Sequence, residues 1–188
     1  MTLVEHLEQY LGEIDGGWKD PQSQNSVQVV VFYDQPFEDI NTYTTLGLSD
    51  YLFVSPAETP CRQELVFTAY KNFDSQKVAS FLSTFADSVI LSHTPLLRGG
   101  VIGPSAPIIL GSPLNSIYSA VPMIFPENFG VYRESIPKTI FPWVIPIHEE
   151  EANYVRANGW SKFECLLEDT NPELWDLRRS STVTHAKS

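Results

Sequence analysis

The chain has 188 residues, of which 43% are hydrophobic and 12% aromatic, which fits a globular protein with its own core rather than a disordered chain. Its 23 acidic and 12 basic residues give a formal net charge of −11, which would repel a nucleic-acid backbone. The same charge would increase the rate of association with a basic partner, although a need for solubility explains the excess of acidic residues more simply.

The N-terminal part of the chain predicts a helix followed by strands. Thr2 and Glu5 have capping-box spacing, and Gly12 ends the amphipathic stretch that they open. Later segments are rich in β-branched residues or alternate between apolar and polar side chains, and they are too short for helices. Strands are therefore expected at 27–33, 40–49 and 63–71, with an acidic turn between the first two.

The longest predicted helix begins after Asp74 or Ser75, and its apolar residues recur at helical spacing as far as Ile90. The stretch that follows is rich in glycine and proline. Its short apolar runs suggest further strands at 107–110 and within 116–125.

The run 139–147 predicts another strand, but it contains Pro142 and Pro146. A proline cannot donate a hydrogen bond to a neighbouring strand. We therefore expect this strand at the edge of a sheet or at a bulge.

A helix is predicted directly after this strand, with Glu149, Glu150 and Glu151 in its first turn and Gly159 just beyond its end. Acidic side chains are favourable there because they interact with the positive end of the helix dipole. A second short helix is predicted at 161–168.

The order of these elements favours one α+β domain over residues 1–180, with a mixed, mostly antiparallel sheet covered by a few helices. Strands outnumber helices, and no regular alternation of strand and helix is present. Residues 181–188 are expected to form a flexible C-terminal tail.

Sequence motifs for metal, phosphate or nucleophile chemistry are incomplete. His148 and Glu149 begin an HExxH pattern, but Ala152 stands where the second histidine would be. Glycines between residues 99 and 103 are not followed by a phosphate-binding lysine, and no GxSxG elbow occurs. We therefore expect no metal, no cofactor and no catalytic residue.

The cellular compartment is predicted from the first residues, from the length of the apolar runs and from the cysteines. The first residues lack the basic and apolar segments of a signal peptide, and no apolar run is long enough to span a bilayer. Cys61 and Cys165 stand far apart, which excludes a disulfide framework and favours two free thiols. A soluble cytoplasmic protein with no membrane partner is expected.

Several phrases in their order resemble the suppressor of fused (SUFU) domain family, from about residue 27 to residue 181. They are TYTTLGLSD at 42–50, RQELVFTAYK at 62–71, FPWVIPIHEEEANYVRANGW at 141–160 and LWDLRRSS at 174–181. The resemblance implies an α+β domain without known catalysis. It also implies a relation to bacterial single-domain members that act as immunity proteins against toxins.

Most residues in these phrases favour structural roles, since fold signals need not mark a binding site. Gly47 fits a tight backbone turn, and Ser49 fits a local cap. Arg178 and Arg179 are predicted to pair with Glu168, Asp169 or Asp176, a group of acids earlier in the chain.

Together, the resemblance and the charge suggest a protein-binding module that occludes a basic toxin domain. The candidate contacts are two acidic groups, Asp34, Glu38 and Asp39 in the turn and Glu149, Glu150 and Glu151 at the helix start. Two alternatives stay open: a scaffolding domain, and a hydrolase that uses Cys61 or a pairing of His93 or His148 with an acid. The oligomeric state is also open.

Overall fold

The larger of two sheets contains seven strands, in the computed structural model that describes residues 1–20 and 25–185. Its strands pair antiparallel except for β6 and β11, which pair parallel. In spatial order they are β1 (Gly16–Trp18), β2 (Gln28–Phe32), β3 (Ile40–Leu46), β6 (Val66–Tyr70), β11 (Trp143–Ile147), β8 (Ser116–Ala120) and β7 (Val101–Ile102).

A smaller sheet lies beside it and was not expected from the sequence. Its spatial order is β4 (Phe53–Val54), β5 (Pro60–Gln63), β10 (Thr139–Ile140) and β9 (Val131–Tyr132). Short 3-10 helices occur at Leu48–Asp50 and Glu127–Gly130. The predicted α+β class with a mixed, mostly antiparallel sheet is confirmed.

The predicted helices are all present, with small shifts at their ends. They are α1 (Leu3–Leu11), α2 (Ser75–Ser92), α3 (Glu149–Asn158) and α4 (Trp160–Thr170), followed by a short α5 (Thr182–His185). Thr2 and Glu5 form the reciprocal capping box on α1, and Asp74 rather than Ser75 caps α2. Within the described part of the chain, no helix combines the length and apolar character needed to cross a bilayer.

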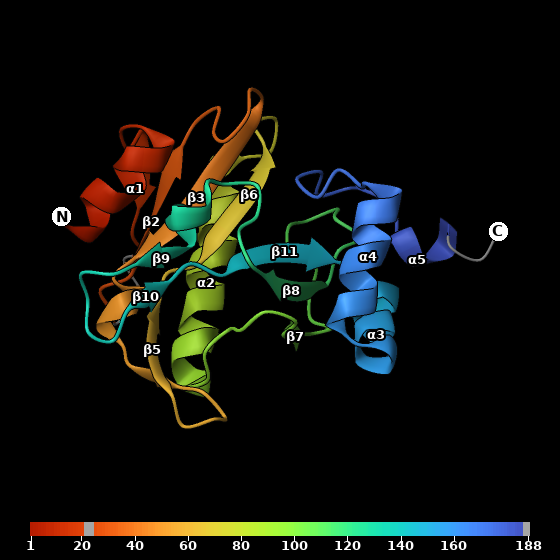
Figure 1. Ribbon diagram of the computed structural model, residues 1–188. Coiled ribbons are helices and arrows are strands. Elements are labelled where there is room, and N and C mark those ends of the chain that lie inside the picture. The colour runs from red at the N-terminus through yellow and green to blue at the C-terminus, as the bar shows by residue number, and fades with distance from the viewer. Residues whose placement is uncertain (21–24, 186–188) are drawn as a thin grey trace.

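Helices cover both faces of the large sheet. Val29 and Val31 of β2 face the core under α2, whereas Val30 and Phe32 face a second core that includes side chains of α1, α3 and α4. Figure 1 shows α1 and the α3–α4 pair at opposite sides of the view, with α2 crossing the strands between them. The sheet is therefore the buried middle layer of the molecule.

The expectation of an edge position for the proline-containing strand is wrong. Strand β11 lies between β6 and β8, and the predicted run 139–147 divides into β10 and β11. Pro142 is compatible with a central position because it only accepts a hydrogen bond: the Val66 amide donates to its carbonyl at 3.0 Å. Pro146 pairs with Ile117 of β8 but lies beyond the single residue pair that joins β11 to β6, so no neighbour needs its missing donor.

The two sheets are joined by one continuous run of parallel hydrogen bonds. It begins between β5 and β10 and continues to the start of β6 and β11. The donors are the amides of Arg62, Glu64 and Val66, and the acceptors are the carbonyls of Lys138, Ile140 and Pro142. Two stretches far apart in sequence thus run side by side across both sheets.

The predicted strand at 107–110 is also wrong. Its residues form bends and a turn in which the Ile108 amide donates to the Leu114 carbonyl, while Leu110 is 95% exposed. The flexible C-terminal tail predicted at 181–188 stays a prediction. Ser181 and Thr182 are nonetheless buried, and residues 186–188 lie outside the described residues.

Candidate protein-binding surface

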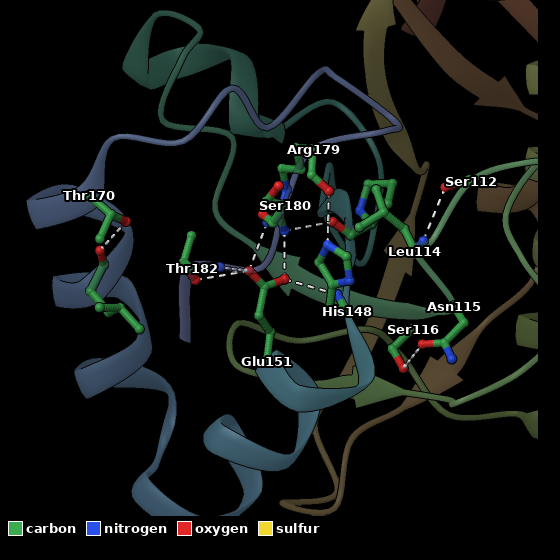
Figure 2. A network of polar contacts seen from close by, with 12 residues as sticks. Ser112, Leu114, Asn115, Ser116, His148, Glu151, Thr170, Arg179, Ser180 and Thr182 are labelled. Carbon is green, nitrogen blue, oxygen red and sulfur yellow. Dashed lines mark hydrogen bonds and ion pairs between the residues drawn. The ribbon is translucent and has the colours of Figure 1, made fainter. Parts of the chain in front are cut away.

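Glu151, one of the six predicted contact residues, is buried in an ion pair. Its side chain has no exposed surface, and its two carboxylate oxygens accept from Nη1 and Nη2 of Arg179, each at 2.7 Å. Figure 2 shows the carboxylate pointing from the start of α3 toward the C-terminal segment. Glu151 therefore presents no surface to a partner, and the expected pairing of Arg179 with Glu168, Asp169 or Asp176 is wrong.

Three further groups complete the network around this ion pair. The Thr182 amide and hydroxyl donate to Glu151 at 2.9 and 2.8 Å, and the His148 amide donates at 2.9 Å. Arg179 also donates to the carbonyl of Pro146, on the side of β11 that no strand covers. Although burial raises the pKa of Glu151, the hydrogen bonds and charge of Arg179 outweigh it and leave the pKa lowered. The network fastens the C-terminal segment to α3 and β11.

A second buried carboxylate, Glu64, explains the GLS motif at 47–49. It accepts from the Thr45 hydroxyl at 2.6 Å and from the amides of Gly47, Leu48 and Ser49 at 2.9, 3.3 and 3.0 Å. Burial raises the pKa of Glu64 to about 7, even though these hydrogen bonds lower it. Glu64 therefore acts as an internal cap that holds a tight turn.

Among the described residues, no hydrogen bond joins the ring of His93 or His148 to a cysteine or to a carboxylate, as the hydrolase alternative would require. The His148 ring bonds to the Arg179 carbonyl at 2.9 Å, and His93 ends α2 in a left-handed conformation on the surface. Burial raises the pKa of the Cys61 thiol, which disfavours the reactive thiolate. Across residues 1–20 and 25–185, no three potential ligands gather as a metal site would require.

Three predicted acids do come together on the turn between β2 and β3. Asp34, Glu38 and Asp39 are exposed, and the Asp39 amide donates to the Asp34 carboxylate at 2.9 Å. Lys71 lies 2.5 Å from Asp39 and 3.5 Å from Asp34, so it offsets part of their charge. The turn is a compact acidic group that retains a net negative charge.

Glu149 and Glu150 are exposed at the start of α3, on a different part of the molecule. Figure 1 places α3 at the opposite side of the view from β2. The structure therefore divides the six predicted contacts into a group of three, a separate pair and one buried residue. The five exposed acids stay predicted contacts.

An aromatic contact that sequence reasoning missed extends the acidic turn. The ring of Phe37, which is 49% exposed, lies 6.1 Å from that of Trp175, and the Tyr70 amide donates to the Trp175 carbonyl at 3.0 Å. These contacts bring the segment after α4 against the turn. Its acidic composition was visible, because five acids and no basic residue stand between Lys162 and Arg178. Its position beside the turn was not.

We call the combined region the acidic–aromatic surface. It consists of Asp34, Phe37, Glu38, Asp39, Glu168, Glu173 and Trp175. Phe37 is exposed and Trp175 is half-buried. Accessible aromatic side chains with acidic neighbours are well suited to contact a basic protein, since the rings supply buried area and the charges supply orientation.

A pocket of about 220 Å³ opens beside Trp175, between the large sheet and α4. Its floor includes Ala120 and Ile145, and Leu167 and Leu174 form part of its wall. Glu164 and Glu168 also line it, but Glu164 already accepts from Arg98 and from the Tyr118 hydroxyl. The pocket is thus apolar inside, with an exposed carboxylate at its border.

Comparison with known proteins assigns the chain to a family. The model of the suppressor of fused protein (SUFU) family matches residues 23–180. The chain belongs to the suppressor of fused family. Among curated relatives, the immunity protein YqcF of Bacillus subtilis (strain 168) is 27% identical over 166 residues, which is 87% of this chain and 85% of that protein. The predicted resemblance to the bacterial SUFU group is confirmed.

Solved structures of SUFU proteins share the fold. A SUFU homologue from Neisseria gonorrhoeae FA 1090 superposes with a TM-score of 0.76 at 16% identity, over 95% of this chain and 93% of that one. Drosophila Suppressor of Fused superposes with a TM-score of 0.77 at 13% identity, over 97% of this chain and 51% of that one. At these identities the likeness concerns the fold alone.

Proposed function

We propose that this SUFU-family chain is a non-catalytic binding protein of the immunity type, which neutralises a toxin protein by occluding it. The observation that carries the proposal is the 27% identity to the immunity protein YqcF across 87% of the chain. Two free cysteines, Cys61 and Cys165, support the cytoplasm as the place of action, because reduced thiols are usual there.

The use of the buried polar groups supports binding rather than catalysis. Glu151 and Arg179 are occupied with each other, and Glu64 is occupied with backbone amides of a turn. A general acid or base has to reach a substrate, whereas the carboxylates of Glu64 and Glu151 are completely buried. In this proposal both groups serve the fold.

The proposed partner is basic. A net charge of −11 gives the chain a field that would accelerate association with a positively charged toxin. Asp34, Glu38 and Asp39 are the favoured contacts because Phe37 and Trp175 add aromatic anchors beside them. The alternative site is the second acidic group, Glu149 and Glu150, in the first turn of α3.

The test is capture of a partner followed by a growth assay. The tagged chain is immobilised, native lysate of the source organism is applied at about 50 mM and about 500 mM salt, and retained proteins are identified. Each retained protein is then expressed in a host with and without this chain. The proposal expects a basic protein that is released at high salt, arrests growth alone and is harmless with the chain. Retained proteins that never affect growth would support the scaffolding alternative and contradict the proposal.

A further inference from the structure

We propose that the pocket beside Trp175 receives one apolar side chain of the partner, while the acids around it bind basic residues on either side of that side chain. This inference rests on the proposed function and names the site and the chemistry of the segment that would occupy it.

The size of the pocket suits a side chain rather than a whole small molecule. Its volume is about 220 Å³, whereas pockets for drug-sized ligands take about 300–1,000 Å³. Leu167 and Leu174 line it, and Met123, which is 61% exposed, stands at its border. An aliphatic or aromatic side chain that entered would leave water for apolar surroundings, which is the usual source of an anchor's affinity.

The walls of the pocket are already fixed. The Trp143 indole donates to the Thr68 hydroxyl at 3.2 Å. The Tyr118 hydroxyl donates to Glu164 at 2.7 Å, and Arg98 holds the same carboxylate through Nε at 3.1 Å. A partner therefore need not order these side chains, and a preformed pocket binds at lower entropic cost.

The charge around the pocket selects a basic segment. Of the described residues that line it, two are acidic and none is basic. Two cations of this region are already engaged in ion pairs, Arg98 with Glu164 and Lys71 with Asp39. Glu168 and Glu173, together with Glu38 beside Phe37, are exposed and remain to receive positive charge. A second copy of this chain would be repelled by the same field, since it also carries −11.

A larger groove on another part of the molecule lacks this selectivity. It follows α2 and the 105–110 loop, with a volume of about 800 Å³. Its charged lining residues are Asp74 and Lys77, one of each sign, and Asp74 is already the cap of α2. Charge therefore favours the smaller pocket for a basic partner.

The first experiment titrates the full chain with a lysine-rich peptide that carries one central leucine, followed by amide chemical shifts and calorimetry. The matched peptide has serine in place of leucine. We expect shift changes centred on Leu167, Leu174 and Trp175, and an affinity about tenfold higher for the leucine peptide. Equal affinities, changes centred elsewhere or no measurable binding would overturn the inference. Because this comparison alters the peptide alone, it does not depend on the stability of a variant.

The second experiment compares Glu168→Lys, at a residue that lines the pocket, with Glu149→Lys, which makes the same charge change on the neighbouring helix α3 outside the pocket lining. Glu168→Lys is expected to weaken the leucine peptide and the captured toxin at least about tenfold, and Glu149→Lys to change either less than about twofold. The reverse order for a toxin that this chain neutralises would overturn the pocket and leave the proposed function standing. If no toxin is neutralised but the leucine peptide binds at Trp175, the pocket is supported and the immunity function fails.

Discussion

Glu151 and Arg179, 28 residues apart in the chain, face each other through two parallel hydrogen bonds with neither side chain appreciably exposed. A buried ion pair of this kind adds little net stability, but removing one partner leaves an uncompensated charge inside the protein. Arg179 is therefore a residue whose loss the fold should not tolerate.

Replacing Arg179 by methionine is expected to lower the free energy of unfolding by about 3–5 kcal/mol, because Glu151 keeps its charge and loses its counter-ion. Urea denaturation followed by circular dichroism measures this change. Glu150→Gln, at the exposed neighbouring position, is the control and should shift stability by less than about 0.5 kcal/mol. The double variant Glu151→Gln with Arg179→Met should recover part of the loss, and a double variant less stable than Arg179→Met alone would contradict this account.

Glu64 should make the protein less stable as pH rises. Its pKa is about 7 in the folded state against an ordinary value of 4.5, so the folded protein keeps a proton that the unfolded chain releases above about pH 4.5. The stabilisation is complete below pH 4.5 and lost between there and about pH 7, with a size on the order of 3 kcal/mol. Between about pH 5 and about pH 8 the unfolding free energy of the wild type should fall relative to that of Glu64→Gln, because the glutamine side chain does not titrate.

Other buried acids oppose this trend, so the comparison with the variant is essential. The pKa values of Glu151 and Glu164 are lowered because Arg179 and Arg98 outweigh the effect of burial. Their stabilisation is present above the unfolded pKa and is lost as pH falls. Glu38→Gln, an exposed substitution, is the control and should follow the wild-type profile. A Glu64→Gln profile parallel to wild type throughout would refute the assignment.

Gly47 should be sensitive to substitution by alanine for two reasons. Its φ is +101°, and a Cβ there would lie 3.2 Å from the Ser26 carbonyl oxygen. Gly111 has a similar φ of +85° with no atom within 4 Å of the added carbon, so it isolates the conformational cost. We expect Gly111→Ala to cost about 1 kcal/mol and Gly47→Ala clearly more, as melting temperatures would report. Equal losses would show that the contact with Ser26 is unimportant.

The acidic turn should act mainly on association rate. Converting Asp34 and Glu38 to Asn and Gln is expected to slow binding of the captured toxin about tenfold at low salt, with little change in dissociation. Glu149→Gln with Glu150→Gln removes the same charge at α3 and should slow it less. Stopped-flow or surface-plasmon kinetics at two salt concentrations would distinguish them. A larger effect of the α3 pair would assign the encounter to that surface.

Local signals predicted the helices well, because caps and spacing act within a few residues. Thr2, Asp74 and Gly159 stand at or just beyond helix ends, where the sequence predicted them. The strand pairings were less accessible, because they join segments far apart in the chain. That is why the smaller sheet was missed, and why the two prolines of 139–147 suggested an edge although β11 has a neighbour on each side.

Glu151 shows how a site prediction failed although a signal was present. Three consecutive glutamates look alike as residues, but α3 buries positions 151, 152 and 155 together. Helical spacing thus places Glu151 on the same face as Ala152 and Val155, and the tertiary partner Arg179 makes its burial tolerable. The contact of Phe37 with Trp175 had no comparable signal, because nothing local relates a turn near residue 37 to a segment near residue 175.

The parallel hydrogen bonds from Arg62 to Val66 affect the order in which the protein folds and the way in which it unfolds locally. These bonds cannot form until distant stretches of the chain meet, so local helices and hairpins should assemble first. Once closed, the run couples both sheets, and its amides should exchange with deuterium only when that coupling is released. The amides of Arg62, Glu64 and Val66 are thus expected to lose their protection together, as one cooperative unit.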